Sequence, residues 1–427
     1  MKLLCLSNGH GEDAVAVRIL RELQQFPDAP EIAALPLVGE GRAYNELENV
    51  PIIGSVKQMP SGGFVYMDGR QLWRDVRSGL IGLTRAQDKA VRRWAKDGGT
   101  ILAVGDVVPL LFAWRSGADY AFVGTAKSEY YLRDDVGWLR RRTFAERLEK
   151  WSGSVYLPWE RCLMGNKRCQ AVFPRDSLTS EILQKYSIPA FDLGNPMMDD
   201  LQEDPSKAKF YDPDAEQREA QRPLTVVLLP GSRAPEAYNN WQVIVSAVAS
   251  LREALADRDI LFLGAIAPGV DLQPLRHELE VYGWHARESD RLPLSDPDAL
   301  RFVQSNATLI LTQHAFRDCL LKADFAIAMA GTATEQFVGL GKPAIAFPGQ
   351  GPQYTPTFAE AQQRLLGSSL ILLPRPDRVV EIAQQLLRDP DWLQAISENG
   401  RRRMGYPGAS RRIANCLMER SIRQAAR

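Results

Sequence analysis

Short apolar runs alternate along the chain with longer stretches in which apolar residues recur at helical spacing. In the first half, runs typical of buried strands occur at Leu3–Leu6, Thr100–Val104, Tyr120–Val123 and Ala171–Phe173. A helical pattern follows the first of them over Glu12–Gln25. Strands that alternate with helices indicate βαβ units and a parallel sheet.

A second set of apolar runs begins after a break in the pattern. Residues 202–222 are polar, charged and poor in large apolar side chains, which is typical of a linker or a solvated loop. The strand-like runs beyond this break are Leu224–Leu229, Ile260–Leu263, Thr308–Leu311, Phe325–Ala328 and Ala344–Phe347.

The length of 427 residues exceeds what one hydrophobic core usually organises. We therefore predict an α/β protein of two doubly wound, Rossmann-like domains that face a central cleft. The first domain spans residues 1–200 and the second residues 224–390, with a linker over 201–223. Residues 391–427 have a helical pattern.

Composition narrows the class of partner. The formal net charge is +0, whereas nucleic-acid binding needs a basic excess, so we expect no nucleic-acid partner. The five cysteines form no CxxC pair, which argues against a zinc site and a disulfide framework. No apolar run approaches the roughly 20 residues that span a bilayer, and the first run is shorter than a signal-peptide core. We expect a cytoplasmic protein.

The first segment with chemical interest is LLPGSRAPE, in which a strand-like run ends at a glycine turn. Gly231 permits the turn, backbone N–H groups near Ser232 can meet an anion, and the Arg233 guanidinium suits a phosphate. Ligands are expected at the carboxyl end of a parallel strand. An ordinary strand-to-helix turn with a surface arginine is the alternative.

A second segment, AIAMAGTATEQF, places small residues between a strand and a helix. Gly331, Thr332 and Ala333 open this helix, where free N–H groups and the helix dipole favour a diphosphate. Glu335 and Gln336 lie in its first turn, within reach of a ribose hydroxyl. The alternative for Glu335 is simple stabilisation of the helix start.

A third segment, SNGHGED, forms a glycine turn before the first helix. Gly9 and Gly11 let a substrate approach the backbone, and His10 is a candidate general base or phosphate-binding cation. Glu12 and Asp13 have the alternative role of capping the helix. The pattern is not GxGxxG, which excludes a nicotinamide dehydrogenase.

A fourth segment, ILAVGDVVPL, ends a strand-like run at Asp106. A carboxylate at the carboxyl end of a strand, where the sheet faces the cleft, can act as a base toward a sugar hydroxyl. The alternative, which the sequence leaves equally open, is that Asp106 caps the following helix.

Several of these segments together resemble lipid-A-disaccharide synthase. They are LLPGSR, the GTA turn with GKP beyond it, and FPRDSLTSEILQKYSIPAFDLGNPMMD, in matching order over most of the chain. The chain is most similar to the branch called lipid-A-disaccharide-synthase-related. The resemblance implies a GT-B fold, a UDP-sugar bound mainly by the second domain and an acceptor bound by the first. It also implies inverting transfer without a metal ion, and helices in 391–427 that cross back to the first domain.

The resemblance assigns roles residue by residue. Arg233 matches the donor-binding arginine of the family's GSR motif, and Gly331, Thr332 and Ala333 match its GTA turn. Asp106 matches the first aspartate of a D-x-x-D strand end.

Three departures from the family pattern bear on the reaction. Pro109 replaces the second aspartate of the D-x-x-D pair, and His10 stands where the family has small residues. The donor-side glutamate of the family aligns with Gln336, while the acid stands one place earlier at Glu335. One residue turns a helical side chain by about 100°, so either Glu335 reaches the donor from another angle or Gln336 serves as a neutral contact.

These residues predict direct displacement at the anomeric carbon. The acceptor hydroxyl attacks with help from His10 or Asp106, while Arg233 and the helix start at Thr332 stabilise the leaving diphosphate. The UDP-sugar is then a substrate, and we expect no cofactor.

Aromatic and basic residues mix over Ser61–Leu83 and Trp138–Arg142, a combination that fits an anionic membrane surface. We therefore predict a lipid acceptor and peripheral contact with the inner face of a membrane, against the alternative of core residues beside solvated charges. Two other functions stay open. One is a UDP-sugar epimerase or hydrolase of the same fold, and the other is a non-catalytic nucleotide-sugar-binding protein.

Overall fold

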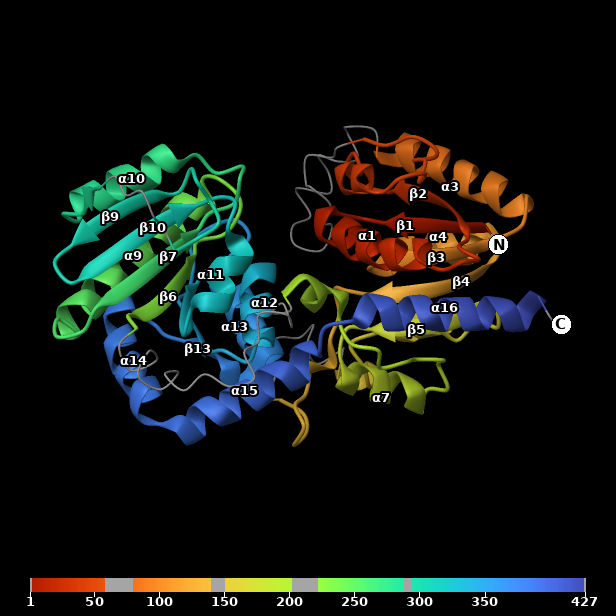
Figure 1. Cartoon of the computed structure of the whole chain (residues 1–427). Coiled ribbons are helices and arrows are strands. Elements are labelled where there is room, and N and C mark those ends of the chain that lie inside the picture. Colours follow the sequence, from red (N-terminus) through yellow and green to blue (C-terminus); the bar gives the residue numbers. More distant parts are fainter. Residues whose placement is uncertain (1, 58–79, 140–149, 202–221, 288–292, 426–427) are drawn as a thin grey trace. The chain divides into compact units, whose positions relative to one another are not determined.

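The computed structural model describes residues 2–57, 80–139, 150–201, 222–287 and 293–425 (Figure 1). The chain divides into two compact units. Unit 1 comprises Met1–Asp199 and Gly405–Arg427, and unit 2 comprises Asp200–Met404. Most of the linker predicted over 201–223 lies outside the described residues.

Unit 1 is built on a five-stranded parallel sheet with the strand order β2-β1-β3-β4-β5. In the first four strands every residue after the first is buried, because helices cover both faces of the sheet. The strands are β1 (Lys2–Ser7), β2 (Glu31–Pro36), β3 (Thr100–Gly105), β4 (Asp119–Gly124) and β5 (Cys169–Pro174).

Two hydrophobic clusters fill the two sides of this sheet. One contains Val15, Ile19 and Leu23 of α1, and the other contains Leu110 and Phe112 of α4. The helices of the first part of the unit are α1 (His10–Gln24), α3 (Leu80–Lys96), α4 (Val107–Ser116), α6 (Pro158–Met164) and α7 (Ser177–Lys185), with 3-10 turns η1 (Arg42–Glu46), η2 (Glu129–Tyr131) and η3 (Pro196–Leu201).

The last helix of the chain, α16 (Ala409–Ala425), completes unit 1 and lies along α1 and β5 (Figure 1). Its Ile413 and Leu417 join the core cluster of α1. The Asp199 carboxylate accepts the N–H groups of Gly408, Ala409 and Ser410 at 2.7, 2.9 and 2.8 Å. A carboxylate there satisfies helix-start donors and complements the dipole, so the end of the LGNPMMD motif has a structural role.

Unit 2 carries an eight-stranded sheet with the order β13-β12-β11-β6-β7-β10-β9-β8. The six strands from β13 to β10 are parallel, and β9 and β8 extend the other side of the sheet by antiparallel pairing. The strands are β6 (Leu224–Leu229), β7 (Ile260–Ala265), β8 (His285–Ala286), β9 (Leu300–Gln304), β10 (Ala307–Thr312), β11 (Phe325–Ala328), β12 (Ala344–Ala346) and β13 (Leu370–Leu372).

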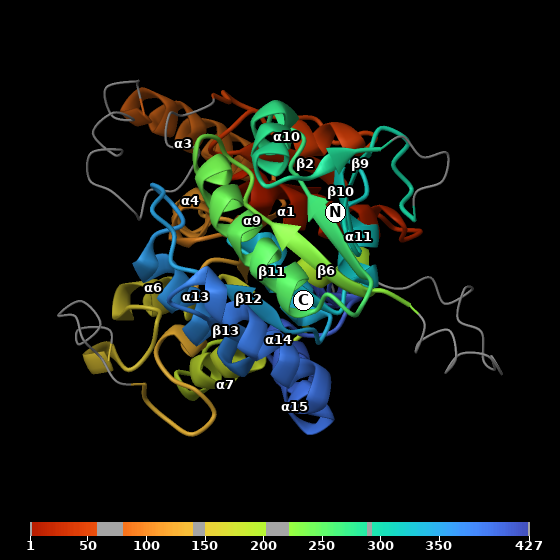
Figure 2. The same ribbon diagram turned by 90° about the vertical axis from the view of Figure 1, so that its left-hand side faces the viewer.

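Helix α9 lies over β6 in Figure 2 and buries Trp241, Ile244 and Val248 against the sheet. The six residues of β6 are all buried, as expected for a central parallel strand. The helices of this unit are α9 (Glu236–Ala254), α10 (Leu272–Val281), α11 (Phe316–Lys322), α12 (Thr332–Gly339), α13 (Pro356–Leu366), α14 (Val379–Arg388) and α15 (Pro390–Met404).

Several predictions at the level of elements need correction. The pattern of apolar runs does not predict β2, β8, β9 and β13, and it gives no sign of the antiparallel edge of unit 2. Helix α1 begins at His10 rather than at Glu12, because the first residues of a helix need no acceptor for their N–H groups. Of the two C-terminal helices, α15 belongs to unit 2 and α16 to unit 1.

Each sheet has one point at which the strand order reverses. In unit 1 the chain goes from β1 to β2 on one side and continues with β3 on the other. In unit 2 the corresponding pair is β6 and β11. In open α/β sheets, ligands bind outside the carboxyl ends of such strands. These two switch points are therefore the places to look for a site.

Candidate functional site

At the β1/β3 switch point of unit 1, Asn8 follows β1 and Asp106 follows β3. Asp106 caps α4, since its Oδ1 accepts the Val108 N–H at 2.8 Å. The Asn8 side chain is a second hydrogen-bond partner of this carboxylate. The structural alternative for Asp106 is thus confirmed, and its role as a base stays a prediction.

Gly105 explains how Asn8 comes so close to β3. Its φ is +132°, and a Cβ atom there would lie 2.1 Å from Asn8 Oδ1 and 3.2 Å from Glu12 Cγ. Any larger residue would displace both side chains. The strand thus ends in a glycine where Asn8 and Glu12 pack beside Asp106.

Opposing influences set the pKa of Asp106. Burial, with help from the Glu12 carboxylate, raises this pKa to about 6. The Val108 N–H, the Asn8 hydrogen bond and the charge of Lys127 act in the opposite direction and limit the rise. A carboxyl group that titrates near neutral pH can both accept and release a proton, which suits general base catalysis.

Lys127 follows β4 and is itself paired. Its Nζ lies 2.7 Å from Glu160 Oε2, and the Glu160 side chain is only 1% exposed. Nζ also donates to the Val155 carbonyl at 3.3 Å. Because these acceptors fix the lysine, its positive charge is held in place near Asp106.

The glycine turn of unit 1 differs from its prediction. Gly9 is the N-cap of α1, whereas His10 and Gly11 are exposed residues of its first turn. Glu12 and Asp13 both lie in the first turn of α1, where acidic side chains complement the helix dipole, so their role at the helix start stays a prediction. Glu12 lies over Gly9, where an added Cβ atom would meet Glu12 Oε2 at 2.6 Å.

Asp13 is buried below this turn. It accepts the Ser7 hydroxyl at 2.5 Å, and the Ser7 Oγ lies 2.7 Å from the Tyr44 hydroxyl. Burial raises the pKa of Asp13 to about 6. This network links β1, α1 and η1 inside unit 1, and it is the reason that Asp13 is unavailable to a substrate.

At the β6/β11 switch point of unit 2, one buried amide joins the two strand ends. Asn240 Nδ2 donates to the carbonyls of Pro230 and Met329 at 3.0 and 3.1 Å. Gly231 has a φ of +101°, so the predicted tight turn is present. Ser232 and Arg233 follow it as exposed residues. The predicted phosphate-binding segment therefore lies at the switch point.

Helix α12 starts at the same switch point. Gly331 is its N-cap and has no side chain that could cap the helix, so the N–H groups at this helix start and the helix dipole can face an anion. Thr332 is exposed and Ala333 half-buried, whereas Glu335 and Gln336 are both buried. The roles of the last two toward a ribose stay predictions.

Two further residues of unit 2 have structural roles. Glu236 Oε1 accepts the N–H groups of Gln353 and Tyr354 at 3.2 and 2.5 Å, which fixes the loop after β12. Lys342 donates to the carbonyls at the end of α11, which are those of Leu320, Leu321 and Ala323. The lysine of the GKP motif therefore caps a helix.

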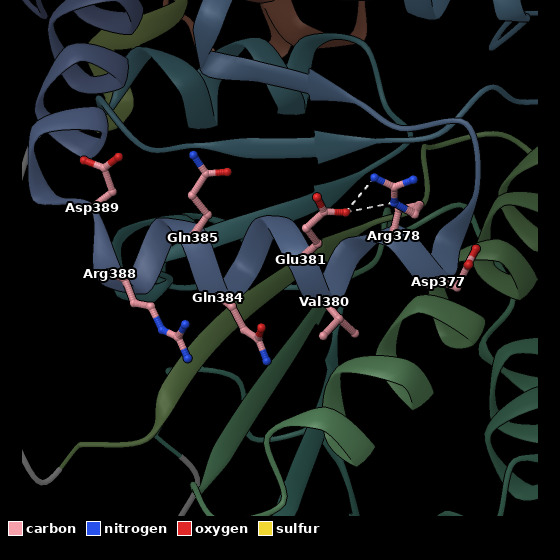
Figure 3. Close-up of a pocket in the computed structure, with 8 residues that line it drawn as sticks. All are labelled: Asp377, Arg378, Val380, Glu381, Gln384, Gln385, Arg388 and Asp389. Carbon is pink, nitrogen blue, oxygen red and sulfur yellow. Dashed lines mark hydrogen bonds and ion pairs between the residues drawn. The ribbon is translucent and has the colours of Figure 1, made fainter.

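Some surface features carry no site. The pocket in Figure 3 is lined only by α14 and the segments that flank it, from Asp377 to Asp389, and includes no predicted residue. Within the described parts of the chain, no group of three or more His, Cys, Asp or Glu side chains is placed to hold a metal ion. No helix in these parts combines the length and apolar character needed to cross a bilayer.

The predicted membrane-contact segments are described only in part. Residues 61–79 and 140–142 lie outside the described residues. Trp138 is 38% exposed, and the Arg133 guanidinium lies over its ring at 3.8 Å from the centroid. Among the described residues of these segments, Trp138 therefore pairs with a cation.

Comparison with known proteins gives the fold. No protein-family model and no curated protein sequence matches the chain. Among solved structures, it is similar to UDP-GlcNAc 2-epimerase from Neisseria meningitidis, bound to UDP-GlcNAc (TM-score 0.57, 16% identity, 98% of this chain and 100% of that one). It is also similar to MurG from Acinetobacter baumannii (0.56, 13%, 98% and 99%) and to the calicheamicin glycosyltransferase CalG4 (0.53, 13%, 98% and 98%).

The chain has the GT-B fold. The likeness extends over nearly all of this chain and of each of these structures, and both units have doubly wound α/β sheets. Membership of the lipid-A-disaccharide-synthase-related family stays a prediction.

Proposed function

We propose that this GT-B protein is an inverting, metal-independent glycosyltransferase that moves a sugar from a UDP-sugar to a lipid-type acceptor, similar to lipid-A-disaccharide synthase. The observation that carries the proposal is the β6/β11 switch point. There the uncapped start of α12 and the exposed Arg233 follow neighbouring strands. N–H groups at a helix start favour a diphosphate, and a guanidinium that follows the neighbouring strand suits the same ligand.

In the proposed reaction, the acceptor hydroxyl gives its proton to the Asp106 carboxylate as its oxygen bonds to the anomeric carbon. The bond from that carbon to the diphosphate oxygen breaks, and the electron pair stays on the nucleotide. Arg233 and the N–H groups at the start of α12 stabilise the charge that develops there. His10, exposed beside the same switch point as Asp106, is the alternative base.

A second candidate function is a UDP-sugar 2-epimerase or hydrolase. It is favoured by the similarity to the UDP-GlcNAc-bound epimerase and by Pro109 in place of the family's second aspartate. Such an enzyme binds the same donor and needs no acceptor. Turnover of a UDP-sugar in the absence of any acceptor separates it from a transferase.

The lipid acceptor and the membrane contact belong to the proposal as well. The exposed part of Trp138 supports them, since tryptophan favours a membrane interface. Co-sedimentation with vesicles that contain an anionic lipid, at low salt, should detect the contact, and neutral vesicles serve as the control. If the protein is absent from the pellets of both kinds of vesicle, the membrane contact is contradicted, while the proposal for the donor still stands.

The experiment for the proposed function is product analysis by mass spectrometry. The protein is incubated with UDP-sugars, with and without extracted membrane lipids. A glycosylated lipid that forms together with UDP supports the transferase. A changed or hydrolysed sugar without lipid supports the second candidate, and no change in any donor contradicts both.

A further inference from the structure

Two buried amide side chains hold the backbone on both sides of the proposed diphosphate site. Asn240 of α9 donates to the carbonyls of Pro230 and Met329, as described above. Gln362 of α13 donates through Nε2 to the carbonyls of Ala330 and Gly331 at 3.0 and 3.1 Å. Each of the two amides is only 2% exposed.

These four carbonyls fix the direction of four N–H groups. In a trans peptide the C=O and the following N–H point in opposite directions. Each N–H is therefore directed away from the amide that holds its own peptide. The N–H groups concerned belong to Gly231, Ala330, Gly331 and Thr332. Within the described residues, none of them donates a hydrogen bond to another protein group.

The arrangement is not explained by the hydrogen-bonding needs of the amides. Gln362 Oε1 is buried and has no hydrogen-bond partner among the described residues. An unsatisfied buried polar atom costs about 1–3 kcal/mol. The two donor bonds of Gln362 are therefore kept although its acceptor atom stays unpaired. Successive N–H groups that converge are a known arrangement for binding anions.

Resting on the proposed function, we infer that Asn240 and Gln362 are positioning residues for the diphosphate of the donor. They act through the backbone, by holding the N–H groups at the ends of β6 and β11 in the direction of the ligand. They touch neither the nucleobase nor the sugar. Their removal should therefore weaken binding of the phosphates and spare the rest of the nucleotide.

The test compares UDP with uridine by titration calorimetry on the full chain. Gln362→Met keeps the size of the side chain, adds no charge and removes the donor. We expect its affinity for UDP to fall about tenfold, which corresponds to the loss of about one hydrogen bond to a charged ligand, while its affinity for uridine stays unchanged. Gln363→Met, at the neighbouring position of α13, is the matched control and should leave both affinities unchanged.

Asn240→Leu tests the same inference from the other helix, so a variant that fails to fold leaves the other to decide. An unchanged UDP affinity in the folded variants overturns the inference. An equal fall in the affinities for UDP and for uridine also overturns it, because such a fall indicates that the whole binding site has been disturbed. A wild-type protein that binds neither ligand overturns the proposed function and the inference with it.

Discussion

The two switch points of this molecule are built from different chemistry. At the β6/β11 point, neutral amides hold backbone N–H groups, and Arg233 is the predicted side-chain cation. At the β1/β3 point, Asp106, Glu12 and Lys127 act on one another's charges. Backbone N–H groups and guanidinium do not titrate near neutral pH, whereas a carboxyl group with a pKa of about 6 does. The difference indicates one place that binds an anion and another that exchanges a proton.

The largest expected effect is a loss of turnover without a loss of UDP affinity, when the proposed base Asp106 is replaced. Asp106→Asn can still accept the Val108 N–H and cap α4, but it cannot take up the proton of an acceptor hydroxyl. We expect turnover to fall at least about 100-fold and the affinity for UDP to stay the same. Steady-state kinetics and calorimetry on one preparation check this. Turnover within about threefold of the wild type would exclude Asp106 as the base and leave His10 as the candidate.

The next largest effect concerns the β6/β11 switch point, where binding rather than proton exchange is expected. Arg233→Ala removes a charge-assisted contact to the diphosphate, so we expect UDP affinity to fall about tenfold or more. The pH dependence of turnover should keep its midpoint. Arg258, exposed in the turn before β7 at the amino end of the sheet, gives the matched control Arg258→Ala. An equal loss in both variants would mean that general charge, rather than the switch point, attracts UDP.

A smaller effect is the direction in which the midpoint of the pH dependence of turnover moves when a neighbour of Asp106 is changed. With Asp106 as the base, activity falls as pH drops through its folded pKa of about 6, because the protonated carboxyl cannot accept a proton. Asn8→Asp replaces the hydrogen-bond donor with a negative charge and should move the midpoint to higher pH. Glu12→Gln removes a repelling charge and should move it to lower pH, with shifts of about one pH unit or less. Shifts in the same direction would contradict the arrangement around Asp106.

The smallest effect concerns stability alone. Lys342→Met removes the donor that satisfies the last carbonyls of α11, and we expect the free energy of unfolding to fall by about 1 kcal/mol. UDP affinity should not change, because Lys342 caps a helix in this structure. Urea unfolding measures the free energy of unfolding, and titration calorimetry on the folded protein measures the UDP affinity. A selective loss of UDP affinity would show that the GKP lysine reaches the ligand.

Much of the fold was predictable because its strands are buried. Leu224–Leu229 is apolar apart from Thr225 and its bounds are those of β6, whereas the edge strand β13 covers only the three residues Leu370–Leu372. Strand β2, Glu31–Pro36, is absent from the predicted strands although five of its six residues are buried. Short or edge strands depend on their neighbours for pairing, and a sequence read alone does not contain that information.

The candidate site was predictable only where a glycine marks it. Gly231 and Gly331 stand at turns beside a strand, and both lie at the switch point that the topology defines. Asn240 and Gln362 lie within helices at a distance in sequence, where an amide carries no distinguishing pattern. For Glu12 the sequence offers only a role at the helix start, because acids are common in the first turn. Only the structure places it over Gly9, beside Gly105.

The central claim is that unit 2 binds a UDP-sugar, and thermal unfolding with a panel of nucleotides tests it most directly. A ligand of the folded protein raises the midpoint as its concentration exceeds its dissociation constant. We predict a rise with UDP and with at least one UDP-sugar, and a smaller rise or none with the other nucleoside diphosphates. A midpoint that no nucleotide or nucleotide sugar shifts would contradict the claim and assign this GT-B fold to another use.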